Sequence, residues 1–342
     1  VITKEVNRRI NKDHDIRILF LVQIGSLLLL SNVFISEWLW FSLGYLQWMI
    51  SVITMTYGAV ALAKKDHFGK NWLIGFLCLL IAAGSYQTIL SYYVFLVMFF
   101  IFVDEKGAVS KESAAAVLRA AAAAVLSIVV NMLFTYALKA AGIISMETRM
   151  DFGWERLGER LRLTADLQKE IWVKGMGLLP EYSAIFVLCI LSGILIVTIY
   201  HKIGFLSFVY ILVVLVSGQS VMYMPELMSG EWSVRMFAPV FGVYTILIWM
   251  ICYYAKYNGR ASSFCRCAAL IVSALFFLIN IIGIQSNALD AVRTNVLDKY
   301  CIRQIGDYIS WYDQNSNMTV QFVGFCYDAA PTYKYHKYID NE

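Results

Sequence analysis

The amino-acid sequence predicts an all-α polytopic membrane protein of about nine transmembrane helices, followed by a small extracytoplasmic α/β segment. Three observations lead to this fold class. Hydrophobic residues make up 60% of the 342 residues, and charged residues only 15%. The mean hydropathy is +0.64, and the apolar residues form runs long enough to cross a bilayer. The net charge of +4 is small. Because the basic residues lie mostly in short loops, they indicate membrane topology and no nucleic-acid partner.

The longest apolar run, residues 72–103, contains no charged side chain. As a single helix it would be about 48 Å long, against a hydrocarbon core of about 30 Å. Its only polar, helix-weakening break is Gly84-Ser85-Tyr86-Gln87. We therefore expect two antiparallel spans that turn at this break.

The distribution of basic residues favours this hairpin, because short cytoplasmic loops carry an excess of Lys and Arg. With two spans in 72–103, ten basic residues fall on one side of the membrane and only Arg235 on the other; with one span, the count is four inside against seven outside. The hairpin places the N-terminus inside, the C-terminus outside, and Tyr86 and Gln87 at the outer surface. The ten residues are Lys64, Lys65, Lys70, Lys106, Lys111, Arg119, Lys202, Lys256, Arg260 and Arg266.

The expected spans form one membrane domain, residues 1–288. Their polar side chains are predicted to form hydrogen bonds between helices; these are Gln23, Asn32, Asn131, Gln219 and Asn280. The chain starts at Val1 with a basic segment and neither an initiator Met nor a signal region, so we expect that an N-terminal portion precedes it. The spans are 18–35, 43–63, the two halves of 72–103, 114–141, 182–200, 203–224, 236–255 and 267–288.

The longest interior loop, residues 142–181, lies on the outer side in this topology. Its apolar residues recur at helical spacing between charged ones, which predicts an amphipathic helix on the membrane surface. The helix either covers the bundle or forms a lid or rim over an outer active site. The apolar residues are Phe152, Trp154, Leu157, Leu161, Leu167, Ile171 and Trp172.

The C-terminal segment, residues 289–342, is predicted to be a small extracytoplasmic α/β unit. A helical stripe begins at Leu289, Val292 and Val296, and residues 319–324 resemble a buried strand. Of the seven cysteines, only Cys301 and Cys326 could share this outer segment. The sequence leaves open whether they form a disulfide.

No soluble-enzyme motif and no metal-ligand motif occurs in the chain, so no cofactor is evident, and the use of a divalent metal stays open. The span interiors contain essentially no ionisable residues, which weighs against an ion-coupled transporter. The polar groups that could do chemistry lie instead at the outer ends of the spans. They are Glu37, Tyr86, Gln87, Glu147, Arg149, Asp151, Glu226, Glu231 and Arg235.

Carboxylates and an arginine at an outer membrane surface suit transfer from a lipid phosphate. An arginine pairs with the phosphate as it leaves, and a carboxylate takes the proton of an acceptor hydroxyl. Arg235 is the strongest candidate, since it is the only basic residue in the short outer loops; its alternative role is an interfacial anchor. For Glu226 and Glu231 the alternative is an ordinary solvated loop.

Two stretches and the tail carry a resemblance to a known family. The chain resembles the bacterial and phage GtrII-type glucosyltransferases, which have a small-residue span and then a Gly/Ser-Tyr-Gln turn that opens the next span. The matching stretches are Tyr57-Gly58-Ala59-Val60-Ala61-Leu62-Ala63-Lys64-Lys65, Ala82-Ala83-Gly84-Ser85-Tyr86-Gln87-Thr88-Ile89-Leu90-Ser91 and Val320-Gln321-Phe322-Val323-Gly324.

The resemblance implies a GT-C-like enzyme of the bacterial cytoplasmic membrane. Such enzymes move a sugar, usually glucose, from a polyprenyl-phosphate donor to a cell-surface polysaccharide or lipid-linked acceptor on the outer face. The family's acidic catalytic residues lie in a first outer loop, and this chain is expected to begin after that loop. Glu37 is then the catalytic candidate within the chain. The expected substrate-binding residues are Arg235, Glu231, Glu226, Tyr86, Gln87 and Arg149.

Three other functions remain open at this stage. A polysaccharide polymerase or ligase would have a larger central outer loop rich in arginine, a description that 142–181 meets only in part. A flippase for lipid-linked sugars would have charged residues in a central cavity, which the spans lack. A structural scaffold would leave the outer acids and Arg235 without a role.

Overall fold

The computed structural model describes residues 1–11, 14–39, 42–64, 68–143, 156–200, 203–229, 233–255 and 260–312, and every regular element within them is helical. The elements are α1 (Ile2–Ile10), α2 (Ile16–Leu30), η1 (Val33–Leu39), α3 (Ser42–Leu62), α4 (Lys70–Ser85), α5 (Ile89–Asp104), α6 (Lys111–Ala140), α7 (Leu157–Trp172), η3 (Gly175–Gly177), α8 (Ser183–Ile199), α9 (Phe205–Met222), α10 (Met224–Ser229), η4 (Val234–Val240), α11 (Phe241–Ala255) and α12 (Arg260–Tyr312).

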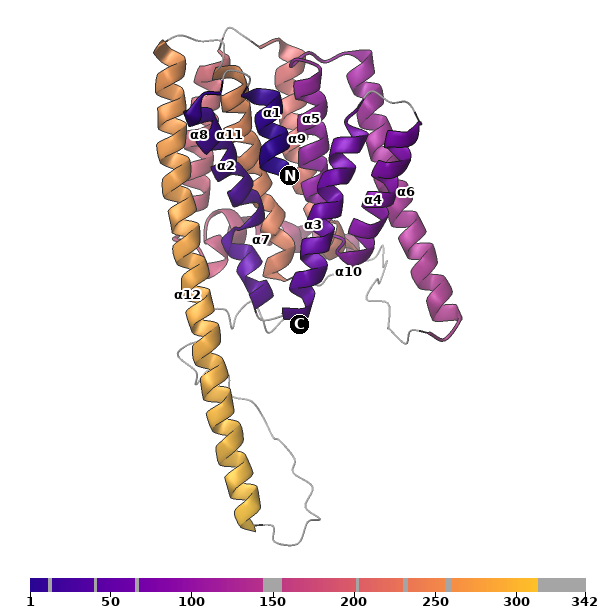
Figure 1. Cartoon of the computed structure of the whole chain (residues 1–342). Helices are drawn as coiled ribbons and strands as arrows, with labels where there is room; N and C mark the ends of the chain where they lie inside the picture. Colours follow the sequence, from indigo (N-terminus) through magenta and orange to yellow (C-terminus); the bar gives the residue numbers. More distant parts are fainter. Residues whose placement is uncertain are drawn as a thin grey trace.

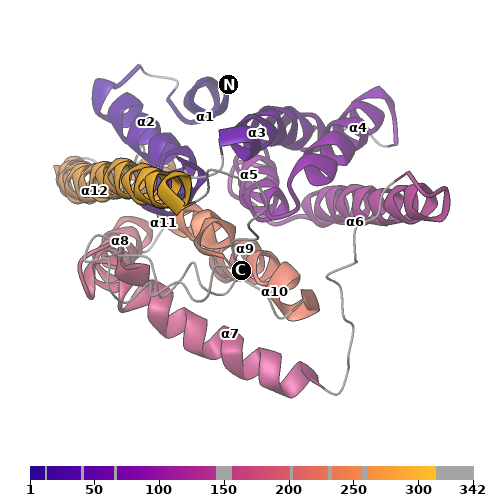
Figure 2. The same cartoon turned by 90° about the horizontal axis from the view of Figure 1, so that it is seen from below.

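The long helices run up and down in one bundle (Figure 1). We call the end that holds the α3–α4 and α5–α6 connections the basic end, because Lys64, Lys70, Lys106 and Lys111 lie there. The opposite, distal end holds η1, the α4–α5 turn, α10 and η4. Helix α7 lies across this distal end, roughly perpendicular to the bundle (Figure 2).

Five of the described helical segments are long and apolar enough to cross a membrane: Gly44–Leu62, Lys111–Ala140, Phe205–Met222, Val234–Ala255 and Ser263–Arg293. Four shorter helices are also apolar, namely α2, α4, α5 and α8. Large apolar side chains cover the outside of the bundle, among them Leu133 and Phe134 of α6 and Ile271 and Ile282 of α12. Soluble monomers rarely expose such extended apolar surfaces. These features indicate a multi-pass membrane protein.

The apolar run 72–103 divides into two helices, as predicted. Helix α4 ends at Ser85 and α5 begins at Ile89, and the two run in opposite directions. Tyr86, the residue after α4, has an extended backbone (φ −158°, ψ 113°), which ends the helical hydrogen-bond pattern. The polar break in the sequence therefore marks the turn correctly.

The centre of the bundle consists of α5 and α11, with α9 beside them (Figure 2). Every residue of α11 and nearly all of α5 are buried, as expected for helices that are apolar on all sides. Phe95 of α5 lies between Gly218 of α9 and Gly242 of α11. A Cβ atom on either glycine would lie less than 3.0 Å from the Phe95 ring. The two glycines thus allow three helices to meet around one aromatic ring.

The predicted interhelical role of polar side chains is confirmed for four of the five. Asn131 Nδ2 of α6 donates to the Leu80 carbonyl of α4 at 3.0 Å, and Gln219 Nε2 of α9 donates to Gln168 Oε1 of α7 at 3.0 Å. Asn32 and Asn280 join elements at the distal end. Gln23 is instead exposed on α2.

Ion pairs connect the helices at the basic end of the bundle. Arg9 of α1 pairs with Glu5 and with Asp104 at the end of α5 (Nε–Oδ1 2.8 Å), and its guanidinium lies 4.4 Å from the centre of the Phe100 ring. Asp15 accepts a hydrogen bond from the Arg17 amide and pairs with Arg266 of α12 at 2.7 Å. The contacts of Arg9 join α1 to α5, and those of Asp15 join the start of α2 to α12.

Helix α12 continues past the expected end of the membrane domain. It has 53 residues, about 80 Å at 1.5 Å per residue, and leaves the bundle at the distal end (Figure 1). The expected boundary at residue 288 falls inside this helix. The predicted helical stripe is confirmed, and Leu289, Val292 and Val296 on it are exposed. The expected strand 319–324 and Cys326 lie outside the described residues, and Cys301 is an exposed free thiol.

Candidate functional site

Two short 3₁₀ segments pack against each other at the distal end. Segment η1 carries Glu37, segment η4 carries Arg235, and the two are in contact. Asn32 Nδ2, just before η1, donates to the Ala238 carbonyl of η4 at 3.2 Å. The rings of Phe34 and Phe241 meet edge to face with centres 5.4 Å apart. The structure therefore brings the segments of the two strongest sequence candidates together.

Arg235 is half-buried, and its neighbours fix the backbone beneath it. Val234 and Phe237 are buried, and the Phe237 ring lies 5.7 Å from that of Tyr223 at the end of α9. Pro239 of η4 lies just before α11, where a missing N–H costs little. Arg235 thus lies on a 3₁₀ segment, η4, that is packed on the core and leads directly into α11.

The α4–α5 turn adjoins the same region. Tyr86 is half-buried against the core, whereas Gln87 is exposed. The Tyr92 side chain of α5 is 1% exposed. Because α5 contacts η4, the turn that carries Tyr86 and opens α5 lies at the same end of the bundle as the junction of η1 and η4.

A polar face on α12 completes the junction, and the sequence reading missed most of it. Asn280, Gly283, Asn287 and Asp290 follow at spacings of three, four and three residues, which puts them on one side of the helix. Asn280 Oδ1 accepts from the Val33 amide at 3.1 Å, and Asn287 Nδ2 donates to Ser36 Oγ at 2.6 Å.

The close approach of α12 to η1 depends on Gly283, because a Cβ atom there would lie 2.7 Å from Val33 Cγ2. Asp290 is 8% exposed, and its Oδ1 lies 4.0 Å from Arg293 Nη1. The spacing of these residues was visible in the sequence. Asp290 lies two residues beyond the expected end of the last span at residue 288.

The prediction of an amphipathic helix in 142–181 is confirmed for Leu157–Trp172, which is α7. Leu167 and Ile171 are buried against the bundle, whereas Leu161 is exposed. Arg160 lies on the buried side, is 6% exposed, and donates through Nη1 to the Leu227 carbonyl of α10 at 3.0 Å. The sequence signal for Arg160 was its position seven residues before Leu167, on the same helix face.

The acidic candidates and Arg149 lie in segments that the structure describes only as backbone or not at all. Glu37 is on η1 and Glu226 on α10, but their side chains are outside the described part of the chain. Glu231, Arg149, Glu147 and Asp151 lie wholly outside it. Among the residues that the structure describes, no three His, Cys, Asp or Glu side chains are grouped so that they could hold a metal ion.

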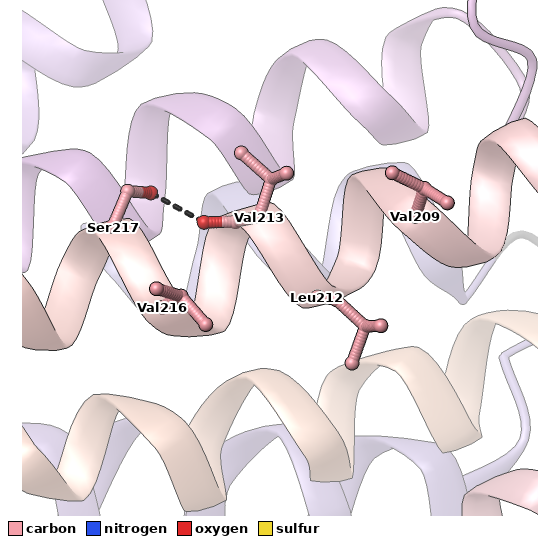
Figure 3. Close-up of a pocket in the computed structure, with 5 residues that line it drawn as sticks. All are labelled: Val209, Leu212, Val213, Val216 and Ser217. Atoms are coloured by element: carbon pink, nitrogen blue, oxygen red, sulfur yellow. Dashed lines mark hydrogen bonds between the residues drawn. The ribbon is translucent and has the colours of Figure 1, made fainter.

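A shallow depression of about 270 Å³ lies on the middle part of one helix, α9 (Figure 3). Four apolar residues line it together with Ser217, whose hydroxyl donates to the Val213 carbonyl at 2.6 Å. A surface of this composition suits a hydrocarbon chain and offers no free polar group for a sugar. The apolar residues are Val209, Leu212, Val213 and Val216.

The chain matches no protein-family profile, no curated protein and no solved structure. The GtrII-type resemblance therefore rests on residues 57–65, 82–91 and 320–324 alone.

Proposed function

We propose that the chain is a membrane glycosyltransferase. In this proposal it moves a sugar, glucose according to the resemblance, from a polyprenyl-phosphate-linked donor to a cell-surface polysaccharide on the outer face of the bacterial cytoplasmic membrane. The observation that carries the proposal is the packing of η1 on η4, which brings the segments of Glu37 and Arg235 together at the distal end.

The proposed topology has nine spans, formed by the five long and four shorter apolar helices. The basic end then faces the cytoplasm, where Lys and Arg are in excess. The distal end, with Arg235, Tyr86 and Gln87, faces outward. In this orientation the N-terminus of the chain is inside and its C-terminus outside.

In the proposed reaction Arg235 pairs with the donor phosphate. A guanidinium forms two parallel hydrogen bonds with phosphate oxygens and stabilises the charge that develops as the sugar leaves. A carboxylate accepts the proton of the attacking acceptor hydroxyl. Glu37 is the candidate for that carboxylate within this chain.

Two further groups of candidates support the outer site. Tyr86 and Gln87 at the α4–α5 turn can donate hydrogen bonds to a sugar or phosphate. Glu226 on α10, together with Glu231 and Arg149, belongs to outer segments in the proposed topology. Helix α7 would then form part of the rim, held to α10 by Arg160.

Arg235→Ala tests the proposal. A lost charge-assisted hydrogen bond costs about 2–3 kcal/mol, a loss of roughly 30- to 150-fold in transfer. The assay measures radiolabelled glucose that passes from glucosyl polyprenyl phosphate to polysaccharide in membranes that contain the chain. Arg162→Ala is the matched control, because Arg162 is exposed on α7 at the same end.

We expect Arg235→Ala to insert normally and lose transfer, while Arg162→Ala keeps it. Near wild-type transfer by Arg235→Ala would remove Arg235 from the mechanism. Movement of intact donor across the membrane without transfer would favour the flippase alternative. Lengthening of the polysaccharide by whole repeat units would favour a polymerase or ligase.

A further inference from the structure

The side of α12 that faces away from the bundle carries a regular repeat of apolar residues. They recur at alternating spacings of four and three, as the a and d positions of a heptad repeat do. Helix α12 stands at the edge of the bundle (Figure 2). Each repeat residue from Ile271 to Val292 follows two positions after a buried residue of α12, about 200° around the helix. We call this repeat the α12 seam: its a positions are Ala268, Leu275, Ile282, Leu289 and Val296, and its d positions are Phe264, Ile271, Leu278, Gln285 and Val292.

The last part of the seam lies beyond the hydrocarbon core. Arg17 Nη1 donates to Ser263 Oγ at 2.9 Å, which places Ser263 at the basic end. Val292 and Val296 are 29 and 33 residues further along α12, which is about 44 and 50 Å against a core of about 30 Å. Both side chains are more than half exposed. Lipid covers an apolar stripe inside the membrane, but in water the exposed stripe costs free energy unless a partner covers it.

The period of the seam indicates that this partner is a helix. A repeat of seven residues keeps one side of a helix against another helix as the two wind into a left-handed supercoil. Inside the membrane most positions of α12 are apolar, so the period there carries little information. Beyond residue 288 polar and charged residues surround the seam, yet Leu289, Val292 and Val296 stay in phase with the membrane part. The same helix partner therefore follows α12 out of the membrane.

We propose that α12 binds α12 of a second copy of this chain in a parallel two-stranded coiled coil. All copies insert in one orientation, so the helices run in the same direction and each layer of the seam meets its own counterpart. The two copies of Gln285 then lie opposite each other near the edge of the hydrocarbon core, where polar side chains form hydrogen bonds between helices. Lys299 and Arg303 take the next d and a positions, and they end the seam because two copies would bring like charges together. This inference does not depend on the proposed function.

The exposed surface of the seam is large enough for a stable dimer. Its eight large apolar side chains are between 53% and 75% exposed. At about 30 Å² for each carbon atom they offer roughly 600–700 Å² in each copy, or about 1,300 Å² in the pair. Stable protein interfaces bury about 1,200–2,000 Å² in total. The bundle lies on the other side of α12, so it leaves the seam accessible (Figures 1 and 2).

The test is disulfide cross-linking of the full chain in membranes. Val292→Cys puts a thiol at a d position outside the hydrocarbon core. The wild type is the matched control, because its own Cys301 is exposed on the same helix but lies five residues after Val296, about 140° away from it around the helix. Both are oxidised with copper phenanthroline and separated on a non-reducing gel. Val296→Glu and Ile305→Glu are then added separately to Val292→Cys; each replaces an exposed β-branched residue, and Ile305 lies off the seam.

We expect Val292→Cys to give a cross-linked species of twice 38.9 kDa, well above the wild-type amount. Val296→Glu should reduce it to the wild-type amount, since it places two carboxylates face to face in an apolar layer, whereas Ile305→Glu should leave it unchanged. A cross-linked fraction of Val292→Cys no greater than that of the wild type overturns the inference, as does equal cross-linking in the two glutamate variants. Val292→Cys decides alone if Val296→Glu is not inserted. A disulfide between Val292→Cys and Cys326 within one chain, in place of the dimer, overturns it in favour of residues 313–342 as the cover.

Discussion

The contact between Phe95 and two glycines gives a sharp test of how the central helices pack. Gly218→Ala adds one methyl group where α9 meets the Phe95 ring, and the new Cβ would lie less than 3.0 Å from ring carbons. Gly193→Ala makes the same change inside α8, where nothing lies within 4 Å of the added atom. The two substitutions therefore share their effect on helix propensity and differ only in packing.

The expected changes in the free energy of unfolding follow from helix propensity and from the packing of the added methyl group. Replacing glycine by alanine inside a helix is favourable by about 0.5–1 kcal/mol. Overpacking a buried site by one carbon costs about 1–3 kcal/mol, because the ring must leave its rotamer or the helices must move apart. We expect Gly193→Ala to stabilise the protein slightly, and Gly218→Ala to be less stable than Gly193→Ala by about 1–3 kcal/mol.

The free energy of unfolding can be measured by titrating SDS into mixed micelles and following tryptophan fluorescence. Phe95→Leu in the Gly218→Ala background should recover part of the loss, since the smaller side chain relieves the contact. Equal stability of Gly218→Ala and Gly193→Ala would refute the packing of α9 on Phe95.

Two further predictions concern the two ends of the bundle. Arg160→Ala should loosen α10 from α7 by about 1.5–3 kcal/mol, because it removes a charged hydrogen bond to the Leu227 carbonyl. The measurement is the rate of thiol labelling at Leu227→Cys. We expect faster labelling with Arg160→Ala than with Arg162→Ala, and equal rates would contradict the loosening of α10. At the basic end, burial raises the pKa of Asp15. The hydrogen bond from the Arg17 amide and the charges of Arg17 and Arg266 lower it more, so the pKa lies below its usual 3.8. The stabilisation by Asp15 is then complete above pH 3.8 and lost as the pH falls through the lowered value. Asp15→Asn should remove that part of the acid sensitivity, and an unchanged pH profile of unfolding would contradict the prediction.

The helices and their order could be predicted because they depend on local hydrophobicity and charge. The turn at Tyr86 followed from a polar break in an apolar run too long for one span, and α7 followed from its helical periodicity. Asn32, Asn131, Gln219 and Asn280 were correctly read as contacts between helices.

The distal junction could not be predicted, because it arises from tertiary packing. Nothing local identifies η1 and η4 as 3₁₀ segments that meet across 200 residues of chain. The last span was expected to end at residue 288, where charged residues begin. Yet residues 285–305 contain neither Gly nor Pro, so no stop signal interrupts α12. Arg160 is one of the charged residues between the apolar ones of this loop, yet it shares the buried side of α7 with Leu167.

The most direct test of the proposed function is the sidedness of sugar transfer. Right-side-out and inverted membrane vesicles that contain the chain are loaded with radiolabelled glucosyl polyprenyl phosphate in both leaflets, and a membrane-impermeant acceptor polysaccharide is added outside. Transfer at the distal, outward-facing end predicts labelled polysaccharide with right-side-out vesicles, and none with inverted vesicles or with vesicles that lack the chain. Label in neither preparation, or only with inverted vesicles, would contradict the proposed function and orientation.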